Sequence, residues 1–279
     1  ILGAIVRFGT KNASYKDRLL SRFPPMSTVN EGYRTARTNI LFSIEKDSKN
    51  VFIVTSASPQ EGKTITTSNL AISMALSGMN VLLIDADLRR PKIHEAFNLE
   101  NSIGLTTLLF CDPTQSIITP EEDPELAGLP KAFVDCIQQS EIAKLHVITS
   151  GFIPSNPTEI LASTAMAKWI EVILSSQVID IVLIDTPPAL AAADASVLAA
   201  NIKAKTILVV DRGATRYGAA KRVKAQFAQL ESSITGLILN RIDPRDENYG
   251  YYYGYYYTAE GQSVTPPKGL GRLFKRQPQ

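Results

Sequence analysis

The sequence predicts an α/β domain in which helices cover both faces of a doubly wound, mostly parallel β-sheet. Short apolar runs rich in Val, Ile and Leu recur along the chain. They are continuous and do not alternate with polar residues, as expected for strands that are buried on both faces of a parallel sheet. Helical patterns separate many of these runs, which is typical of strand–helix–strand units. Hydrophobic residues make up 44% of the 279 residues, enough for a sizeable core.

The predicted elements follow one another in a regular order. The strands are the runs 51–55, 81–84, 145–148, 181–184, 206–210 and 234–239. The helices are the runs 64–77, 157–175 and 219–230. From this order we predict a single domain over residues 27–243.

Three segments fall outside this alternation. Residues 1–26 end in a Phe-Pro-Pro breaker and are interpreted as a linker that could include a short strand. Residues 111–131 are rich in Pro and acidic residues, which indicates a surface insertion. Residues 244–279 contain the run YGYYYGYYY and then Pro, Gly and Lys residues, so we predict a flexible, tyrosine-rich tail.

Composition excludes several classes of function. The net charge is only +2, which argues against nucleic acid as the main partner. No apolar run approaches the roughly 18 residues of a membrane helix. The two cysteines are far apart, and neither of the two histidines has a partner at an interpretable spacing. A disulfide framework, a zinc site and a histidine-based triad are therefore not expected.

The stretch ASPQEGKT, residues 57–64, lies between a predicted strand and a predicted helix. It matches the phosphate-binding pattern G-x-x-x-x-G-K-[ST] with Ala57 in the first position, and it predicts a P-loop NTPase fold. Backbone N–H groups and the helix N-terminus offer positive partial charge to phosphates. Gly62 lets the backbone approach, Lys63 supplies a mobile cation, and the Thr64 hydroxyl can bind Mg²⁺. The nucleotide-binding residues that this loop predicts are Ser58, Pro59, Gln60, Glu61, Gly62, Lys63, Thr64 and Ile65. Because Glu61 has the wrong charge for a phosphate, we expect its side chain to point to solvent.

Three aspartates follow two other predicted strands. VLLIDADLRRP places Asp85 and Asp87 after the strand 81–84, and IVLIDTPP places Asp185 after the strand 181–184. Ligands bind at the carboxyl ends of the strands in open α/β sheets. If both strands neighbour the strand before the phosphate loop, the three carboxylates converge on Mg²⁺ and the γ-phosphate. A single strand-end aspartate would be explained equally well as a cap, but three beside a phosphate loop favour a metal site.

At this point the chain resembles a known family. ASPQEGKT, LLIDADLRRP and LIDTPP are similar to the Walker A, Walker A′ and Walker B motifs of bacterial tyrosine kinases, the cytoplasmic autokinases that control capsule and exopolysaccharide synthesis. NEGYRTARTNI resembles the family's Glu-x-x-Arg-x-x-Arg element through Glu31, Arg34 and Arg37. GFIPSNPTEIL resembles its glycine-proline-asparagine-proline segment. ILGAIVRF resembles the strand that joins the kinase to a membrane-anchored chain-length regulator.

The resemblance implies transfer of the γ-phosphoryl group of ATP, with Mg²⁺, to tyrosines of the chain's own tail. The implied acceptors are Tyr249, Tyr251, Tyr252, Tyr253, Tyr255, Tyr256 and Tyr257. The implied catalytic residues are Lys63, Asp85, Asp87 and Asp185, and the implied metal ligands are Thr64, Asp85 and Asp185. Either Asp85 or Asp87 accepts the phenolic proton, and we favour Asp85. Arg89 is either a charge clamp or an ion-pair partner that holds the loop. Asn240 resembles a residue that reads the adenine edge, although a turn cap fits nearly as well.

The resemblance also implies partners. It implies a homo-oligomeric ring in which each tail enters the neighbouring site, with Glu31, Arg34 and Arg37 at the subunit contact. The same Glu31–Arg34 spacing is otherwise that of an ordinary i,i+3 pair. An extended chain from Asn240 to Tyr251 covers about 36 Å, comparable with a domain diameter. The implied activator is a membrane chain-length regulator, fused upstream or separate, and polysaccharide-synthesis proteins are implied as further substrates. The implied location is the cytoplasmic face of the bacterial inner membrane, with residues 1–26 juxtamembrane and this chain itself soluble.

Two other functions remain open from the sequence. The first is a partition- or division-type P-loop ATPase that switches an assembly by hydrolysis, although such proteins carry a lysine where this chain has Ser58. The second is a non-catalytic nucleotide-binding adaptor. One departure from the kinase pattern is the insertion at 111–131, which replaces the shorter connection expected in the family and would alter the surface on the substrate side.

Overall fold

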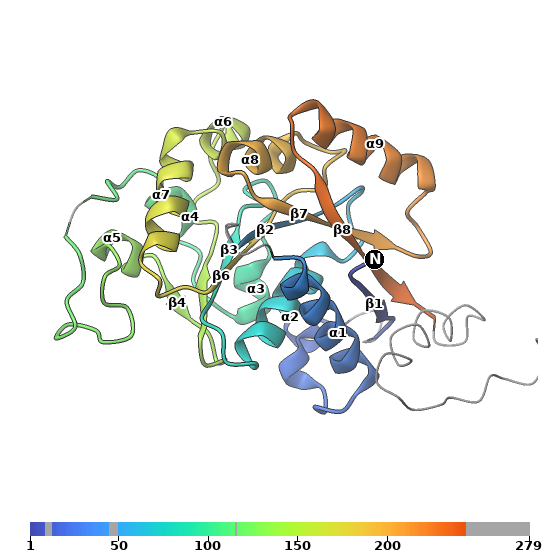
Figure 1. The fold of residues 1–279 in the computed structure, drawn as a ribbon, viewed down its shortest axis with the longest axis horizontal. Coiled ribbons are helices and arrows are strands. Elements are labelled where there is room, and N and C mark those ends of the chain that lie inside the picture. Colours follow the sequence, from blue (N-terminus) through green and yellow to red (C-terminus); the bar gives the residue numbers. More distant parts are fainter. Residues whose placement is uncertain (9–12, 45–49, 115, 244–279) are drawn as a thin grey trace, which may run out of the picture. The chain divides into compact units, whose positions relative to one another are not determined.

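An eight-stranded sheet forms the centre of the protein in a computed structural model that describes residues 1–8, 13–44, 50–114 and 116–243 (Figure 1). The strand order is β1-β8-β7-β2-β6-β3-β5-β4. The strands are β1 (Gly3–Val6), β2 (Val51–Ser56), β3 (Val81–Asp85), β4 (Gln138–Gln139), β5 (Leu145–Ile148), β6 (Ile181–Asp185), β7 (Lys205–Asp211) and β8 (Ile234–Ile242). Every neighbouring pair of these is parallel except β4 with β5. The predicted fold is therefore confirmed.

Helices cover both faces of the sheet. They are α1 (Thr28–Phe42), α2 (Lys63–Ala75), α3 (Ile93–Phe97), α4 (Leu105–Leu108), α5 (Lys131–Val134), α6 (Pro157–Leu161), α7 (Thr164–Ser175), α8 (Asp194–Ile202) and α9 (Tyr217–Gln229). In Figure 1, α1, α2 and α3 lie on one side of the sheet, and α6, α7, α8 and α9 lie on the other. Every residue of β2, β3, β5 and β6 is buried, because helices cover these central strands on both faces. No helix in the described part of the chain meets the length and apolarity of a membrane span.

All six predicted strands form, but one predicted helix is divided. The run 157–175 forms two helices, α6 and α7, rather than one. The Ser163 side chain accepts the backbone N–H of Met166 and so caps a new helix start. The Asn201 side chain donates to the backbone oxygens of Leu161 and Ser163, both at 3.0 Å, which satisfies the end of α6.

Residues 1–26 are part of the compact unit that extends from Ile1 to Ile242. The short strand that the sequence suggested is β1, which pairs in parallel with β8 at the edge of the sheet. Helix α1 lies directly over β1, because Gly3 leaves room for Ala36. The backbone N–H of Leu20 donates to the Asn69 side chain of α2 at 2.8 Å. This segment therefore packs as part of the fold, whereas we expected a linker.

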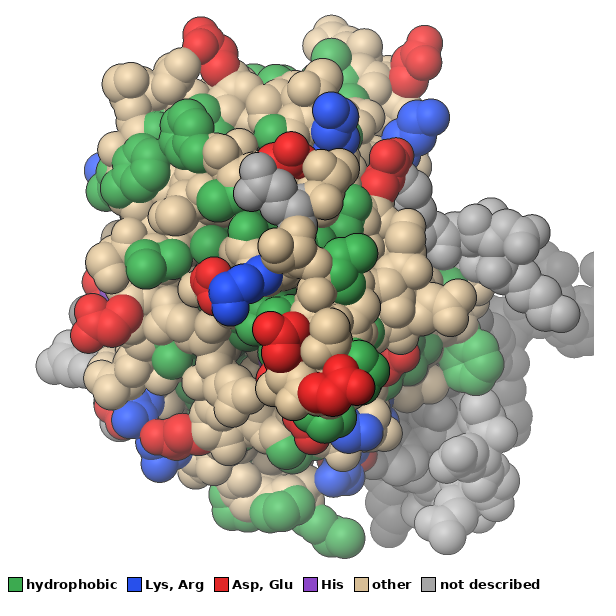
Figure 2. Space-filling model, turned by 90° about the vertical axis from the view of Figure 1, so that its left-hand side faces the viewer, with side chains coloured by type: hydrophobic (Ala, Val, Ile, Leu, Met, Phe, Trp, Pro, Cys, Tyr) green, Lys and Arg blue, Asp and Glu red, His purple; other side chains and the backbone are tan. Residues whose placement is uncertain are grey.

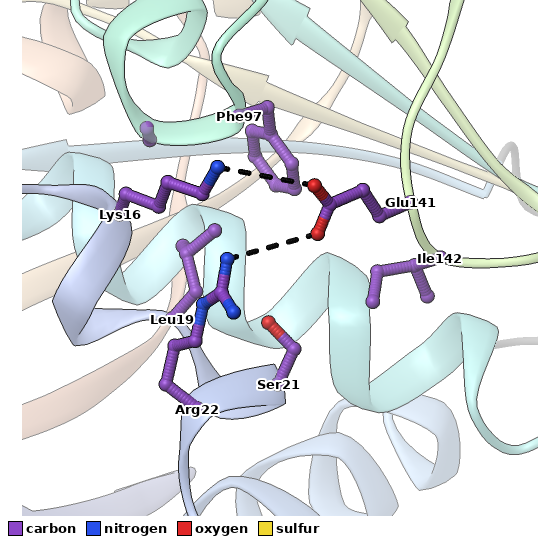
Figure 3. A pocket seen from close by; sticks show the side chains of 8 residues that line it. Lys16, Leu19, Ser21, Arg22, Phe97, Glu141 and Ile142 are labelled. Carbon is purple, nitrogen blue, oxygen red and sulfur yellow. Dashed lines mark ion pairs between the residues drawn. The ribbon is translucent and has the colours of Figure 1, made fainter.

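Two basic side chains of this segment also pair with the loop after β4. Lys16 and Arg22 lie 3.8 and 3.7 Å from the two carboxylate oxygens of Glu141 (Figure 3). The Glu141 side chain is 74% exposed, so these pairs contribute little to stability. The cavity between them holds only about 20 Å³, room for about one water molecule, and is not a ligand site.

The predicted insertion at 111–131 lies largely at the surface. It is anchored by three buried side chains, Ile118, Leu126 and Leu129. An antiparallel bridge between Ile117 and Pro130 closes its ends. The insertion is therefore tied to the hydrophobic core by its own apolar residues, despite its exposed acidic ones.

Candidate active site

The sheet topology brings the predicted motifs to one edge. Strand β6 lies between β2, which leads into the phosphate loop, and β3, which leads into the Asp85 loop. Asp185 pairs in register with Val54 on one side and with Asp85 on the other. The predicted convergence of the carboxylates was conditional on both aspartate strands being neighbours of β2. Only β6 is its neighbour, and β3 is one strand further away. Because all three are parallel, their carboxyl ends still meet at the same edge.

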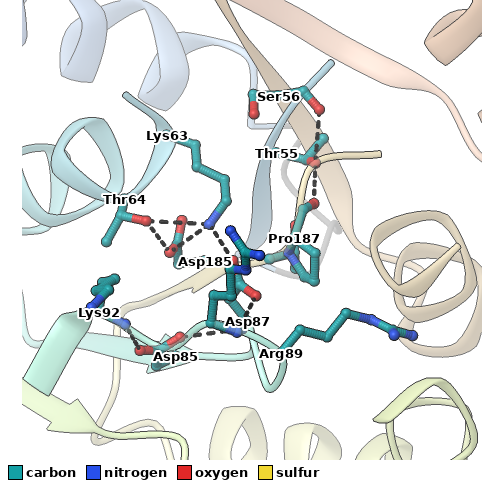
Figure 4. Close-up of polar contacts among 12 residues, drawn as sticks. Thr55, Ser56, Lys63, Thr64, Asp85, Asp87, Arg89, Lys92, Asp185 and Pro187 are labelled. Atoms are coloured by element: carbon teal, nitrogen blue, oxygen red, sulfur yellow. Dashed lines mark hydrogen bonds and ion pairs between the residues drawn. The ribbon is translucent and has the colours of Figure 1, made fainter. Parts of the chain in front are cut away.

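Lys63 lies at the centre of a buried polar cluster (Figure 4). Its Nζ is 2.8 Å from an oxygen of Asp87 and 3.2 Å from one of Asp185. The Thr64 hydroxyl donates to Asp185 at 2.7 Å, and the Thr67 hydroxyl donates to the other Asp185 oxygen at 3.1 Å. The sequence analysis missed Thr67, although its position three residues after Thr64 places both hydroxyls on one helix face.

Asp85 is held by its own loop. Its carboxylate accepts backbone N–H groups from Asp87, Lys92 and Ile93 at 3.2, 3.0 and 2.9 Å. These three bonds fold residues 85–93 into a turn and leave Asp87 as the aspartate of this loop that contacts Lys63. The structure therefore brings Lys63, Asp87 and Asp185 into direct contact, with Asp85 beside them.

The cluster holds more negative than positive charge. Burial raises the pKa of Asp85 to about 7, and the neighbouring Asp185 carboxylate adds to this. Burial also raises the pKa of Asp185, partly offset by Lys63. Burial alone would lower the pKa of Lys63, but the attraction of Asp185 and Asp87 outweighs it and raises the pKa. Three carboxylates and one ammonium leave an excess of two negative charges when all are ionised.

This charge imbalance suits a divalent cation. The Thr64 hydroxyl and the Asp185 carboxylate are hard oxygen ligands of the kind that Mg²⁺ prefers. Within the described residues, no three His, Cys, Asp or Glu side chains are grouped so that they would hold a metal by themselves. Mg²⁺ commonly binds through one or two protein oxygens, together with water and substrate phosphates. The residues present therefore fit Mg²⁺ bound together with a nucleotide.

The phosphate loop has the backbone that the motif requires. Gly62 has a φ of +90°, and a Cβ there would lie 2.3 Å from the side-chain nitrogen of Asn240. That Asn240 nitrogen donates to the backbone oxygen of Glu61 at 2.9 Å, so the end of β8 supports the loop. Gln60 also has a positive φ, 66°, which the sequence did not indicate. Ala57 does not, so alanine replaces the first glycine there without backbone strain.

The other loop residues occupy two environments. Ser58, Pro59 and Gln60 are exposed, whereas Ile65 is buried in the first turn of α2. Ser58 is fixed through its backbone oxygen, which accepts the Ser56 hydroxyl at 2.8 Å.

The prediction for Glu61 is wrong. Glu61 is only 3% exposed, and its carboxylate accepts three hydrogen bonds instead of facing solvent. The donors are the backbone N–H groups of Ala57 and Ser58, at 2.8 and 3.1 Å, and the Thr215 hydroxyl, at 2.7 Å. Repulsion from a phosphate, which motivated the prediction, is outweighed here because the first turn of the loop has its own N–H donors, which an anion can satisfy.

The exposed Arg89 side chain forms an ion pair with a buried aspartate. Its guanidinium donates to both oxygens of Asp194 at 2.8 and 3.0 Å and to the Thr158 hydroxyl at 3.0 Å. Asp194 is fully buried in the first turn of α8. The sequence left two roles open for Arg89, a charge clamp and an ion pair that holds the loop. The observed geometry is that of the ion pair. No pattern in the sequence indicated Asp194 as the partner of Arg89, because it lies 105 residues away.

Glu31 and Arg34 form the expected i,i+3 pair on α1, at 2.5 Å. Arg37 instead donates to the backbone oxygen of Ser73 in α2, at 2.8 Å. Arg37 therefore joins two helices of the same chain.

The tail tyrosines lie outside the described residues, as does the whole predicted tail segment 244–279. These tyrosines are Tyr249, Tyr251, Tyr252, Tyr253, Tyr255, Tyr256 and Tyr257.

Comparison with known proteins agrees with this geometry. Residues 52–264 match the family model of the CobQ/CobB/MinD/ParA nucleotide binding domain. The chain is 41% identical over 234 residues to the tyrosine-protein kinase YwqD of Bacillus subtilis, covering 82% of this chain and 88% of that protein. It is 32% identical to the putative tyrosine-protein kinase CapB of Staphylococcus aureus, covering 83% and 92% of the two chains.

Solved structures lead to the same group. The chimerical protein CapA2B2 superposes with a TM-score of 0.71 at 30% identity, covering 87% of this chain and 94% of that one. The kinase domain of the Escherichia coli tyrosine kinase ETK also gives a TM-score of 0.71, at 28% identity, covering 88% and 92%. With its phosphate loop and aspartate loops joined at one sheet edge, the chain belongs to the CobQ/CobB/MinD/ParA nucleotide-binding family and, within it, to the bacterial tyrosine kinases.

Proposed function

We propose that this tyrosine kinase uses ATP and Mg²⁺ to phosphorylate the tyrosine cluster in the tail of a neighbouring copy, and so regulates capsule or exopolysaccharide synthesis. The observation that carries the proposal is the contact of Lys63 with Asp87 and Asp185 beneath a phosphate loop. The same chain carries seven tyrosines between Tyr249 and Tyr257. Phosphoryl transfer needs mainly positioning and charge stabilisation, and this cluster has the groups for both.

Each residue has a proposed role in the reaction. Lys63 turns from the carboxylates to the γ-phosphate and stabilises its negative charge. Thr64 and Asp185 would hold Mg²⁺, and the bound ion would supply positive charge that stabilises the phosphates. Asp85 accepts the phenolic proton, and its pKa of about 7 supports this role at neutral pH. Asp87 orients Lys63 and the acceptor.

The remaining nucleotide contacts follow from the loop. The backbone N–H groups from Gln60 to Ile65 surround the start of α2, where the helix dipole favours phosphate. Asn240, 5% exposed at the end of β8, is proposed to contact the adenine edge on the far side of the loop. Its contact with Glu61 supports a position next to the nucleotide.

The proposed partners follow from the similarity to related proteins. The similarity to the chimerical protein CapA2B2 supports a membrane chain-length regulator as the activator, either fused upstream or separate. It would hold the kinase at the cytoplasmic face of the inner membrane. A homo-oligomeric ring, with Arg34 exposed and Glu31 partly exposed beside it, brings one tail to the next site. Proteins of polysaccharide synthesis are the proposed external substrates.

Labelling with radioactive ATP and Mg²⁺ tests the proposal. We expect label on the protein that is lost when all seven tail tyrosines are replaced by Phe, because they are the acceptors. Lys63→Met should also abolish labelling while circular dichroism shows an intact fold, although the melting temperature should fall because Asp87 and Asp185 lose their buried counter-charge. Asp85→Asn and Asp185→Asn should each lower the rate by several orders of magnitude. Wild-type labelling in the Lys63 variant would contradict the assignment of the site.

One alternative is supported by the family model, which also covers the MinD and ParA ATPases. In that case the chain switches an assembly by hydrolysing ATP, and the tail has another purpose. Release of free phosphate without labelled protein would indicate this function. Nucleotide binding with neither product would indicate a non-catalytic adaptor.

A further inference from the structure

Helix α9 and the loop before it carry a concentrated positive charge. Residues 212–230 contain five Lys or Arg residues and no Asp or Glu, in a chain whose net charge is only +2. Four of these side chains, which we call the α9 basic surface, are Arg216, Lys221, Arg222 and Lys224. Acidic and basic side chains are interspersed on the face of the molecule that Figure 2 shows. The concentration of positive charge on α9 is therefore a local feature of the surface.

The α9 basic surface has no counter-charge within the described residues. All four side chains are exposed, and none forms an ion pair or hydrogen bond with the part of the chain that the structure describes. The helix is held instead by its other side, where Val223 and Phe227 are fully buried. Four like charges on one helix repel each other, and nothing in the packing of α9 requires them.

The surface borders a cleft beside the phosphate loop. This cleft of about 560 Å³ is lined by Arg216 and Arg222 from the first turns of α9, and by Ser58 of the phosphate loop. Its size is in the range of pockets that hold small ligands or side chains. Thr215 also lines it and donates to Glu61, so the cleft wall and the phosphate loop are directly connected.

The chain itself contains a segment of opposite charge. Residues 246–267 contain three acidic residues and no basic residue, and they include all seven tyrosines of the cluster. Each phosphorylated tyrosine would add about −1.5 to −2 charges. Arginine is well suited to phosphate, because its planar guanidinium can donate two parallel hydrogen bonds to it.

We propose that the α9 basic surface and its cleft bind the phosphorylated tyrosine segment, residues 249–257, after the kinase has modified it. This inference rests on the proposed autophosphorylation. Arg216 and Arg222 receive a phosphotyrosine in the cleft, and Lys221 and Lys224 attract neighbouring phosphates. Binding there removes the phosphorylated segment from the metal site and frees that site for another acceptor tyrosine.

The test measures peptide binding directly and does not depend on catalysis. The probe is a fluorescent peptide of residues 243–260, made with phosphotyrosine at positions 251 and 253 or with unmodified tyrosine. The protein is the full chain with its seven tail tyrosines replaced by Phe, so that its own phosphates cannot compete. We expect the phosphopeptide to bind at least tenfold more tightly than the unmodified peptide, with an affinity that falls as salt rises.

Two double variants test whether the α9 basic surface is the one that binds the phosphopeptide. Arg216→Glu/Arg222→Glu should lower the phosphopeptide affinity at least tenfold without changing the melting temperature. The matched control, Lys131→Glu/Lys168→Glu, removes the same charge from exposed sites on α5 and α7 and should have little effect. Equal binding of both peptides, or equal loss in both double variants, overturns the proposal. So does equal binding of a polyglutamate of matched charge.

A membrane is the other anionic partner that the test must separate. Vesicles of phosphatidylcholine with phosphatidylglycerol provide the probe. Binding to these vesicles without phosphopeptide binding would show that the surface faces lipid, and would overturn the proposal. Phosphopeptide binding in a chain that labels no tyrosine would instead leave this surface intact and refute the proposed autokinase function.

Discussion

At the scale of single residues, the site depends on buried charges that compensate one another. Lys63 is only 8% exposed, and it remains charged because Asp87 and Asp185 lie within 3.2 Å. Glu61 plays a comparable part at the start of the phosphate loop, where its carboxylate satisfies two backbone N–H groups. Removing one partner of such a pair leaves the other buried without compensation, which costs more than the interaction itself contributes.

Replacing Glu61 tests its role in shaping the phosphate loop. Glu61→Ala leaves the N–H groups of Ala57 and Ser58 and the Thr215 hydroxyl without their acceptor, each at a cost of about 1–3 kcal/mol where buried. We expect the affinity for ATP, measured by calorimetry, to fall about tenfold or more, and Glu61→Gln to have a smaller effect because it keeps one acceptor oxygen. The control is Glu141→Ala at a 74% exposed side chain, which should change nothing. Unchanged ATP binding in Glu61→Ala would refute the role.

The raised pKa of Asp85 makes stability depend on pH. Its pKa is 3.8 in an ordinary setting and about 7 in the metal-free fold, so between these values the folded state holds a proton that the unfolded state has lost. Stability from this group is therefore present below pH ~4 and is lost as pH rises toward ~7. We expect urea unfolding of the metal-free protein to show wild type losing stability relative to Asp85→Asn between about pH 4 and about pH 7. Parallel pH profiles of the two proteins would contradict this.

At the scale of elements, close contacts determine which segments belong together. Helix α1 approaches β1 because both carry small residues at the crossing, Gly3 and Ala36. This contact, with the pairing of β1 to β8, incorporates residues 1–8 into the sheet. Similarly, the Arg89–Asp194 pair joins the loop after β3 to the start of α8. Each contact joins segments that are far apart in the sequence, so the pattern of either segment alone did not reveal it.

The α1–β1 contact predicts a packing defect on substitution. A Cβ at Gly3 would lie 2.6 Å from the Cβ of Ala36, so Gly3→Val must push α1 away from β1. Such overpacking costs about 1–3 kcal/mol, and each kcal/mol lowers the melting temperature of a domain of this size by about 2–4 °C. Calorimetry should show this loss. In Gly218→Ala, where nothing lies within 4 Å of the new Cβ, the melting temperature should stay the same or rise slightly.

At the scale of the whole molecule, the proposed acceptor segment and the proposed catalytic site lie on separate parts of the chain. The proposed catalytic and nucleotide-binding groups lie within residues 57–240, and the tyrosine cluster begins at Tyr249. Transfer between copies requires an oligomer, and α1 presents Glu31 and Arg34 at the surface while Arg37 is engaged with Ser73. Of the three predicted contact residues, the first two are therefore the suitable ones to test.

Charge reversal on α1 tests the proposed oligomer. Arg34→Glu places two acidic side chains three residues apart and should dissociate the assembly, which native mass spectrometry can follow. Transphosphorylation between a Lys63→Met chain and a tail-substituted chain should fall in parallel. Arg22→Glu is the matched control, since it alters an exposed ion pair of residues 1–26. Assemblies of unchanged size in Arg34→Glu would show that this part of α1 is not the contact.

The sequence by itself determined the fold class, the six central strands and the phosphate and aspartate motifs, because hydrophobic periodicity and motif spacing are local properties. It correctly indicated that Asp85 and Asp185 end strands, since both follow buried apolar runs. Only the tertiary structure decided that Glu61 turns into the loop, that Arg89 pairs with Asp194 and that β1 completes the sheet. Those outcomes depend on donors and partners supplied by distant segments, and the free energy of a buried polar group depends on what surrounds it.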